Sequence, residues 1–490
     1  MFTLTGMANT IYSDSMTESF KMLIGGHWLP AEELFEITNK YNGELLGRVP
    51  TCDKEIFEMA VRAARDGFET LSNTPSYQRA RILSKTSQLI DSAKEDLAEL
   101  IAQEAGKPIK QALTEVERAV QTFQFASEEA KNIHGKTVPM DAAVGSEGKV
   151  GFYLRFPAGI VGAITPFNFP LNLVAHKVAP AIAAGCSVIL KPSSLTPLIA
   201  IKLGEIMQEA ELPAGGLNIV FGSGDAVGSW MVTDPRIALI SFTGSPPAGK
   251  KIKESSGLKK VVLELGSNSA VIIDETADLD SAIPLCVKGS FNFAGQSCIS
   301  VQRIYVHKQI FDKFVESFLG EVKKLKVGNP SSKETDVGPM ITETESKRIE
   351  SWVNEAVRQG AKMLIGGKRQ SQFFQPTVLT NVKPEMKVVA NEVFAPLVSL
   401  IPFADFEEAL NLVNDSVYGL QAGIFTRDIQ KAFAAVKKLK VGGVMINDVS
   451  TYRADHMPYG GVKESGLGRE GVKYAVEEMT DIKMVCFNLI

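Results

Sequence analysis

The sequence predicts an α/β fold with two domains, each built on a parallel sheet that helices cover on both faces. Its length of 490 residues leaves room for two large domains or three smaller ones, at about 150 residues per domain. A hydrophobic content of 45% and a charged content of 22% are ordinary globular values. Short apolar runs alternate with helical segments over residues 159–263 and again over 270–446, which is the pattern of βα units.

Helices are expected before the first strong strand. Residues 1–20 are polar and rich in Ser and Thr without a sustained period, so we treat them as an N-terminal extension. Apolar residues then recur at three-to-four spacing from residue 53 to residue 134, which predicts three or four amphipathic helices.

Buried strands then alternate with helices. Each expected strand is a short apolar run, and the runs of the first domain lie at 160–164, 187–190, 217–221, 238–242 and 261–263. The helices between them are expected near 171–184 and 198–210. Strands of the second domain include 300–306, 395–401 and 422–425. Ligands of such sheets lie at the carboxyl ends of the strands, so polar residues directly after these runs are site candidates.

The charge balance argues against several partners. Lys and Arg total 52 against 56 Asp and Glu, a net charge of −4, so we expect neither nucleic acid nor a membrane surface as partner. The most apolar stretch, 178–190, contains Pro180 and Gly185 and is shorter than the roughly 20 residues of a membrane span. The amino terminus lacks the features of a secretory signal.

Five cysteines are scattered through the chain without a C-x-x-C pair. Neither a disulfide framework nor a metal site is predicted, and a reducing, cytoplasmic location follows. Cys298 stands apart because Glu264, which ends the apolar run 261–263, offers the base or water activator that a thiolate nucleophile needs. By itself this pair is weak evidence for a catalytic site, since a lone cysteine is usually a small buried hydrophobe and a glutamate after a strand is usually solvated.

Three further segments follow expected strands. Asn168, in Thr-Pro-Phe-Asn-Phe-Pro, is either a turn residue or an amide donor to an oxyanion. Lys191 ends the second strand and faces either a ligand or solvent. Residues 242–245 precede a helix whose free N–H groups could meet a phosphate. The glycine cluster at 222–228 has one residue too many for the G-x-G-x-x-G fingerprint.

Taken together, these segments closely resemble the aldehyde dehydrogenase superfamily, whose NAD(P)-dependent members oxidise aldehydes to carboxylic acids. The resemblance extends from about Leu23 to the C-terminus. It is carried by motifs in order at 165–170, 190–194, 242–245, 264–266, 295–298, 392–396 and 459–461 with 465–470. The 34-residue separation of Glu264 and Cys298 also resembles the family's spacing.

The resemblance implies covalent catalysis. Cys298 would attack the aldehyde to give a thiohemiacetal, whose oxyanion would be held by the Asn168 amide and the Cys298 backbone N–H. After hydride transfer to the nicotinamide, Glu264 would activate the water that hydrolyses the thioester, and Glu470 would act as a proton relay. Relatives that pass the acyl group to coenzyme A generally lack this glutamate, so hydrolysis is expected.

The resemblance also implies a site for NADP or NAD. Ser194 lies where NAD-preferring members often carry an acidic residue. A small hydroxyl there leaves room for a 2′-phosphate near Lys191, so NADP should be accepted at least as well as NAD. The expected cofactor contacts are Thr165, Pro166, Phe167, Lys191, Ser193, Ser194, Gly224, Gly228, Phe242, Gly244, Ser245, Leu265, Glu392 and Phe394.

Two positions depart from the family pattern. Ser267 replaces the usual second glycine after Glu264, and it would be strained if that position needs a positive φ. Tyr459 replaces the usual Phe before the late double glycine, where it should pack similarly while adding a hydroxyl.

The resemblance implies a small polar or anionic aldehyde as substrate. The branch that looks most similar is that of lactaldehyde and non-phosphorylating glyceraldehyde-3-phosphate dehydrogenases, with succinic semialdehyde as the alternative. Arg118 and Arg453 are candidates to pair with an anionic tail, because a guanidinium presents a fork of donors. The alternative is that both are surface or interdomain arginines. The expected substrate contacts are Arg118, Phe167, Phe293, Ile299, Tyr452 and Arg453.

By the same resemblance, the fold comprises two Rossmann-like three-layer domains and a small β segment for oligomerisation. Residues 21–140 and 158–263 are assigned to the NAD(P)-binding domain and 264–445 to the catalytic domain. Residues 141–157 and 470–490 are expected to supply strands that join subunits into a dimer or a tetramer. The alternative for these strands is an ordinary edge hairpin.

Two other classes of function are weaker. A non-catalytic binding protein with this fold has no need of Cys298 together with Glu264. A thiol hydrolase would normally pair its cysteine with a histidine, and the five histidines lie outside the motif segments.

Overall fold

The helical region before the first strong strand contains four helices, α1 (Lys54–Asn73), α2 (Ser76–Ser92), α3 (Lys94–Ala105) and α4 (Ile109–Glu129). The structure is a computed structural model that describes residues 19–489, so residues 1–18 of the expected N-terminal extension lie outside the described residues. The Asp53 carboxylate caps α1 by accepting a hydrogen bond from the Ile56 N–H at 2.8 Å. Helix α3 ends at Gly106, whose φ of 72° suits a left-handed cap.

The first sheet has eight strands in the order β2-β1-β9-β8-β7-β10-β11-β21. Its five central strands are parallel, and the edge strands pair antiparallel. The strands are β1 (Met22–Ile24), β2 (His27–Leu29), β7 (Ile160–Ile164), β8 (Ser187–Lys191), β9 (Leu217–Ile219), β10 (Ile237–Thr243), β11 (Lys260–Glu264) and β21 (Gly466–Leu467). Strands β7 and β8 are buried throughout, as continuous apolar runs require in a parallel sheet.

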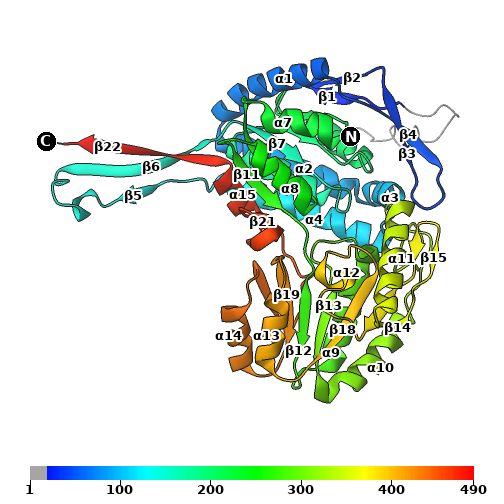
Figure 1. Cartoon of the computed structure of the whole chain (residues 1–490). Coiled ribbons are helices and arrows are strands. Elements are labelled where there is room, and N and C mark those ends of the chain that lie inside the picture. Colours follow the sequence, from blue (N-terminus) through cyan, green and yellow to red (C-terminus); the bar gives the residue numbers. More distant parts are fainter. Residues whose placement is uncertain (1–18, 490) are drawn as a thin grey trace, which may run out of the picture.

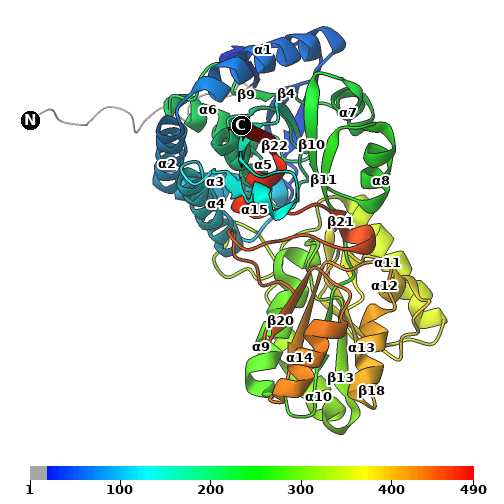
Figure 2. The same cartoon turned by 90° about the vertical axis from the view of Figure 1, so that its left-hand side faces the viewer.

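Helices lie on both sides of this sheet. In Figure 2, α2 and α4 lie on one side of the upper lobe, and α7 and α8 lie on the other. The short π-helix η2 (Gly224–Gly228) leads into α7. The helices that connect the parallel strands are α5 (Asn172–Ala184), α6 (Leu198–Glu209), α7 (Ser229–Thr233) and α8 (Pro246–Ser255).

The second sheet forms the lower lobe of Figure 1 and has seven strands in the order β14-β17-β18-β13-β12-β19-β20. The strands are β12 (Ala270–Ile273), β13 (Arg303–His307), β14 (Lys362–Ile365), β17 (Thr377–Thr380), β18 (Leu397–Phe403), β19 (Gln421–Phe425) and β20 (Gly443–Ile446). All neighbouring pairs are parallel except β14 with β17.

Successive residues of β12 belong to two different hydrophobic cores, which shows that the second lobe also has three layers. Val271 and Ile273 belong to the core with α9 (Leu279–Phe291), α10 (Phe311–Val322) and α11 (Glu343–Arg358). Ala270 and Ile272 belong to a separate core with α13 (Phe406–Asn414) and α14 (Ile429–Lys438). Successive strand residues point to opposite faces, so helices cover both faces of the sheet. The predicted α/β class with two Rossmann-like three-layer units is confirmed.

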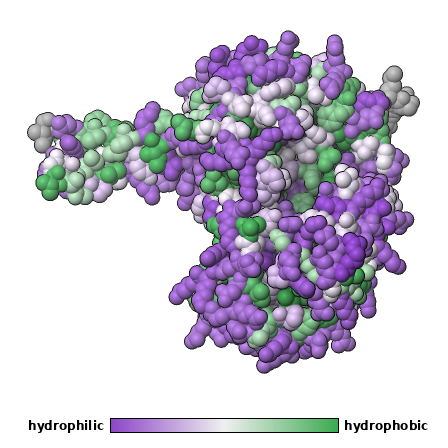
Figure 3. Space-filling view, viewed as in Figure 1, coloured by the Kyte–Doolittle hydropathy of each residue, from purple (hydrophilic) through white to green (hydrophobic). Residues whose placement is uncertain are grey.

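A three-stranded antiparallel arm projects from the upper lobe (Figure 1). It consists of β5 (Lys136–Val138), β6 (Lys149–Pro157) and β22 (Thr480–Asn488), in the order β22-β6-β5. The arm differs from the expected segments 141–157 and 470–490 at two places. It begins before residue 141, because β5 joins it. Residues 472–478 form helix α15 (Val472–Glu478), which packs against α4 and α5 and is not part of the arm. Figure 3 shows apolar residues along the arm.

The remaining elements are short. Strands β3 (Leu34–Thr38) and β4 (Leu45–Pro50) form a hairpin, as do β15 (Arg369–Gln370) and β16 (Phe373–Phe374). The other helical segments are η1 (Met140–Ala142), η3 (Asn292–Gly295), η4 (Lys308–Ile310), α12 (Lys387–Ala390) and η5 (Lys463–Ser465). Within residues 19–489, no helix combines the length and the apolar character needed to cross a membrane.

Candidate active site

The carboxyl edge of the first sheet gathers several of the predicted residues. Parallel pairing places Ile164 opposite Lys191 at the ends of β7 and β8. It likewise places Thr243 opposite Glu264 at the ends of β10 and β11. The segment 165–168 leaves β7 at this edge, so the amide of Asn168 joins the same region.

The candidate nucleophile Cys298 lies in a tightly held loop of the second lobe. Three consecutive residues before it have positive φ: Phe293 at 48°, Ala294 at 53° and Gly295 at 67°. A Cβ on Gly295 would lie 2.1 Å from the Ala395 carbonyl oxygen, so only glycine fits there. Non-glycine residues in this region cost about 1–3 kcal/mol each and persist only when their surroundings hold them.

Gln296 anchors this loop. Its side-chain oxygen accepts a hydrogen bond from the Ile341 N–H at 2.9 Å, and its amide nitrogen donates to the Phe293 carbonyl at 3.2 Å. Gln296 is fully buried, whereas Cys298 remains half-buried. The loop therefore presents the sulfur from a fixed backbone.

Two N–H donors, the Asn168 amide and the Cys298 backbone, lie at the loop that carries the Cys298 sulfur. The Asn168 amide nitrogen donates to the Gln296 carbonyl at 3.0 Å, which ties the first lobe to the Cys298 loop. An amide nitrogen carries two hydrogens, so one remains for a ligand. The Cys298 backbone N–H has no acceptor among the described residues. This arrangement is suited to holding an oxyanion.

Glu264 is buried without a partner. Both carboxyl oxygens are shielded from solvent, and neither accepts or donates a hydrogen bond within the described chain. Burial raises the pKa of Glu264 well above its ordinary value, and the neighbouring Glu470 adds to this rise. This shift favours the acid form of the side chain, which must ionise before it can act as a base.

Glu470, by contrast, is fully paired. Its oxygens accept hydrogen bonds from the Lys177 ammonium at 2.7 Å and the Arg453 guanidinium at 3.0 Å. Although burial opposes ionisation, these two cations hold the pKa of Glu470 well below its usual range. The proton-relay role predicted for Glu470 would require one of these ion pairs to open.

Tyr459 contacts the candidate nucleophile directly. Its hydroxyl lies 3.1 Å from the Cys298 sulfur, and the Arg453 guanidinium lies 3.6 Å from the centre of its ring. Burial raises the pKa of the Cys298 thiol to about 11, and the Tyr459 hydrogen bond acts against this rise. Sequence reasoning anticipated the extra hydroxyl at this position but not its contact with sulfur.

The strain expected at Ser267 does not arise. Neither Gly266 nor Ser267 has a positive φ. Gly266 makes room for a side chain instead, because a Cβ there would lie 2.1 Å from a Glu392 carboxyl oxygen and would force that side chain to move. The Ser267 N–H donates to Glu392 at 3.1 Å, and burial raises the pKa of Glu392 to about 7.

The two candidate arginines are both ion-paired. Arg118 donates two hydrogen bonds to Asp455, at 2.7 and 3.1 Å, and Arg453 donates to Glu470. Asp455 also accepts from the Asn172 amide at 3.0 Å and lies 2.8 Å from His176. Arg118 retains some solvent exposure, and the buried Nε of Arg453 has no partner among the described residues. Both arginines, which were candidates to pair with an anionic tail, are thus members of an ordered polar cluster with Asp455, Glu470 and His176.

The other expected substrate contacts lie at different depths. Phe167 meets Phe394 edge to face, with ring centres 5.9 Å apart, across the two lobes. Ile299 packs with Tyr459 in a small apolar cluster. Tyr452 is 52% exposed, so it lies at the surface rather than beside the sulfur.

Several of the expected cofactor residues lie at the carboxyl edge of the first sheet, whereas Glu392 and Phe394 belong to the second lobe. Lys191 is buried, its pKa is lowered to about 8 by burial, and its ammonium donates only to the Pro192 carbonyl among described residues. The Ser194 hydroxyl donates to the Gly222 carbonyl at 3.1 Å. The buried hydroxyl of Thr165 has no partner within the described part of the chain.

The N-terminus of α8 is also available. Ser245 precedes this ten-residue helix, with no side chain capping it. Gly224 and Gly228 on η2 have open space where a Cβ would be. The Gly244 N–H donates to the Glu264 carbonyl at 3.0 Å, which connects this loop to β11. Backbone N–H groups at a helix N-terminus suit a phosphate, but Pro246 and Pro247 open α8 and have no N–H, so fewer donors than usual are present here.

Comparison with known proteins identifies the family. The chain matches the model of the aldehyde dehydrogenase family over residues 28–485. It belongs to this family. The 3-sulfolactaldehyde dehydrogenase of Priestia aryabhattai is 48% identical over 476 residues, which cover 97% of this chain and 99% of the relative.

Two solved structures of aldehyde dehydrogenases share the fold. Aldehyde dehydrogenase 21 from Physcomitrella patens, in complex with its reaction product succinate, has a TM-score of 0.95 and 42% identity, covering 97% of this chain and 99% of that one. The glyceraldehyde-3-phosphate dehydrogenase GapN from Methanocaldococcus jannaschii, complexed with NADP, has a TM-score of 0.90 and 42% identity, covering 94% and 100%.

Sequence reasoning missed three buried members of this aldehyde dehydrogenase's polar cluster, namely Lys177, His176 and Asp455. Lys177 and His176 lie on α5, whose other residues after Asn172 are apolar. The only available signal was two charged or titratable residues inside an otherwise apolar helix, since buried charges need partners.

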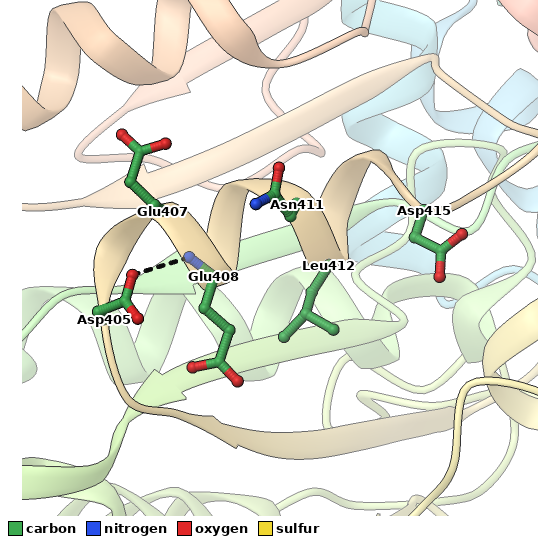
Figure 4. Close-up of a pocket in the computed structure, with 6 residues that line it drawn as sticks. All are labelled: Asp405, Glu407, Glu408, Asn411, Leu412 and Asp415. Carbon is green, nitrogen blue, oxygen red and sulfur yellow. Dashed lines mark hydrogen bonds between the residues drawn. The ribbon is translucent and has the colours of Figure 1, made fainter.

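A separate pocket lies on the surface of the second lobe, along α13 (Figure 4). The Asp405 carboxylate caps α13 there by accepting from the Glu408 N–H at 3.0 Å, and Glu407 pairs with Lys438. None of the predicted site residues lines this pocket. Among residues 19–489, no group of three or more His, Cys, Asp or Glu side chains is placed to hold a metal ion.

Proposed function

We propose that this aldehyde dehydrogenase oxidises small polar or anionic aldehydes to carboxylic acids with NADP or NAD, through covalent attachment to Cys298. The observation that carries the proposal is the juxtaposition at the Cys298 loop. The loop that carries this half-buried sulfur is bound by the Asn168 amide at Gln296, and the Cys298 backbone N–H has no acceptor among the described residues. Glu264, whose pKa is raised, lies in the adjoining buried cluster.

The first half of the reaction forms a carbon–sulfur bond. The Cys298 thiolate attacks the aldehyde carbon, and the carbonyl electron pair moves to oxygen. The Asn168 amide and the Cys298 N–H stabilise that oxyanion. When bound, NADP or NAD supplies the hydride acceptor, and a thioester on Cys298 remains. A thiol suits this role because sulfur is nucleophilic and also leaves as a thiolate.

The second half hydrolyses the thioester. Ionised Glu264 takes a proton from water, the water oxygen bonds to the acyl carbon, and Cys298 leaves as a thiolate. Burial opposes this ionisation, while the nearby Arg453 and Lys177 favour it.

The edge of the first sheet fits a dinucleotide. Two side chains offer donors there: the Thr165 hydroxyl and the Lys191 ammonium, neither of which has a side-chain partner among the described residues. Nothing acidic stands at Ser194, whose hydroxyl is held on Gly222. A 2′-phosphate therefore meets a cation without a repelling carboxylate, which supports use of NADP.

The two arginines of the polar cluster favour an anionic substrate. Arg118 and Arg453 pair with the carboxylates of Asp455 and Glu470. Arg118 keeps some solvent exposure, and the Arg453 Nε has no partner among the described residues, so both have donors to offer an anionic tail.

The relatives agree with this substrate class. Their names and bound molecules involve a sulfonate, a phosphate and a carboxylate. We therefore favour short hydroxylated aldehydes of the lactaldehyde or glyceraldehyde-3-phosphate type, including those with an anionic tail. Succinic semialdehyde is the second candidate, because the moss relative holds succinate.

The decisive assay follows the absorbance of reduced nicotinamide with lactaldehyde, glyceraldehyde 3-phosphate, succinic semialdehyde and hexanal. We expect the polar aldehydes to exceed hexanal in kcat/KM. Arg118→Ala should lose activity on the anionic aldehydes while hexanal is unaffected. Arg236→Ala, which removes an arginine ion-paired to Asp234 outside the cluster, is the control. If hexanal is the best substrate and Arg118→Ala behaves like the control, the anionic-tail proposal fails.

We also propose that the arm joins subunits into a dimer or a tetramer. Its apolar side chains are exposed on both faces of a thin sheet: Val150, Leu154, Phe156, Ile482, Met484 and Phe487. A second copy of the chain would cover them. A cytoplasmic location remains a proposal, in line with five free cysteines.

A further inference from the structure

The hydroxyl of Tyr459 is held against the candidate nucleophile. It lies 3.1 Å from the Cys298 sulfur, and the Tyr459 side chain is only 3% exposed. The Tyr459 backbone is fixed on both sides by Glu470, with the Tyr459 N–H donating at 3.0 Å and its carbonyl accepting at 2.7 Å. The ring therefore has little freedom to swing away from the sulfur.

A cation covers the face of this ring. The Arg453 guanidinium lies 3.6 Å from the ring centre, and Glu470 holds it there through a 3.0 Å hydrogen bond. A guanidinium over an aromatic face is attracted to the ring's electrons, and its charge stabilises nearby negative charge. It therefore strengthens the phenol as a donor and favours a thiolate at Cys298, whose pKa it lowers.

The direction of the hydrogen bond follows from the groups that face the pair. Burial raises the pKa of Tyr459 well above its ordinary value, Cys298 and Glu264 raise it further, and Arg453 acts in the opposite direction. The phenol thus keeps its proton. Around Cys298, burial, Glu392 and Glu264 oppose the thiolate, whereas Tyr459 and Arg453 favour it. An ionised sulfur can accept only from the Tyr459 O–H.

We propose that Tyr459 is a further catalytic residue, which donates a hydrogen bond to the Cys298 sulfur whenever that sulfur carries negative charge. This happens twice in the proposed reaction, before attack on the aldehyde and again when the sulfur leaves the thioester. The second part rests on the proposed function. The first part is a property of the free enzyme alone.

A purely structural role would require only the ring. Phenylalanine would fill the same space, cover the same side of the cluster and accept Arg453 on its face, while making no contact with sulfur. The Tyr459→Phe variant therefore separates the two roles, because it removes a single oxygen atom.

The test measures alkylation of Cys298 by iodoacetamide across neutral and alkaline pH, followed by mass spectrometry of the Cys298 peptide. No aldehyde or cofactor is added, so the result is independent of the proposed function. Tyr305→Phe is the matched control. It removes another buried hydroxyl, one that donates to the Leu412 carbonyl at 3.3 Å in the second lobe.

For Tyr459→Phe we expect a higher apparent thiol pKa and about tenfold slower alkylation at neutral pH, since a hydrogen bond to a charged group stabilises more than one between neutral groups. Tyr305→Phe should match the unsubstituted enzyme. Ultraviolet absorbance of the thiolate, with Cys298→Ser as the blank, gives a second measure of the same pKa. Profiles of Tyr459→Phe that superimpose on those of the unsubstituted enzyme by either measure would overturn the proposal.

Discussion

The carboxyl groups of Glu264 and Glu470 share one buried cluster, but their surroundings shift their pKa values in opposite directions. Glu470 accepts hydrogen bonds from Lys177 and Arg453, so its pKa lies well below the usual range. Glu264 has no partner for either oxygen within the described chain, and burial raises its pKa. Environments that push two carboxyl groups apart in this way assign them different roles: Glu470 is a fixed anion, and Glu264 can take up and release a proton.

Replacing Glu264 by Gln should stop hydrolysis while leaving acylation intact. A general base contributes about 10²- to 10⁴-fold, so turnover should fall by that order while a burst of reduced nicotinamide remains. Because only ionised Glu264 accepts a proton, thioester hydrolysis in the unsubstituted enzyme should increase as the pH rises through the raised pKa of Glu264. Rapid-mixing kinetics across pH measure both effects. A variant that keeps the alkaline increase would contradict this role.

Removing the Asn168 donor should slow acylation without unfolding the protein. The loss of one oxyanion donor typically costs about 10²- to 10³-fold in kcat. Asn168→Asp keeps the size of the side chain but has no N–H to donate, so it should be impaired like Asn168→Ala. Steady-state kinetics together with thermal melting test this. Near-normal activity of the Asp variant would show that the amide donor is not needed.

A carboxylate at position 194 should shift the cofactor preference. Ser194→Glu would place a negative charge near Lys191 and repel a 2′-phosphate, raising KM for NADP by at least about tenfold. KM for NAD should stay the same or fall. Ser194→Ala, which loses only the hydrogen bond to Gly222, should retain use of NADP. If unsubstituted enzyme already strongly prefers NAD, the assignment of Ser194 is wrong.

Charges on the arm should dissociate subunits. Ile482 and Met484 are exposed apolar residues on β22, and burying a glutamate against a second copy is costly. We expect Ile482→Glu with Met484→Glu to give monomers in light scattering coupled to gel filtration, with Lys483→Glu between them as the control for added charge. If the double variant keeps the molecular mass of the unsubstituted protein, the arm does not join subunits.

The central strands of the first sheet could be predicted closely, because β7 and β8 are buried on both faces and appear as unbroken apolar runs. The extra β5 strand could not, since three residues with no apolar alternation carry no strand signal. The same holds for the positive φ of Phe293 and Ala294, which the surrounding structure imposes on ordinary residue types.

The polar cluster was only partly predictable, because its contacts are remote in the chain. Lys177 reaches Glu470 across 293 positions, and Cys298 reaches Tyr459 across 161. No local spacing encodes such pairs. Family motifs pointed to Cys298, Glu264 and Asn168. The residues that shift the pKa values of Cys298 and Glu264 come from distant parts of the chain, so only the three-dimensional structure shows them.

The central claim is that the substrate becomes covalently attached to Cys298. Mass spectrometry of Glu264→Gln after brief exposure to aldehyde and NADP tests it most directly. We predict one acyl group per chain, mapped to the Cys298 peptide and absent when Cys298 is also replaced by Ser. An unmodified Cys298 peptide, or a Cys298→Ser enzyme that turns over as fast as the unsubstituted one, would contradict the account.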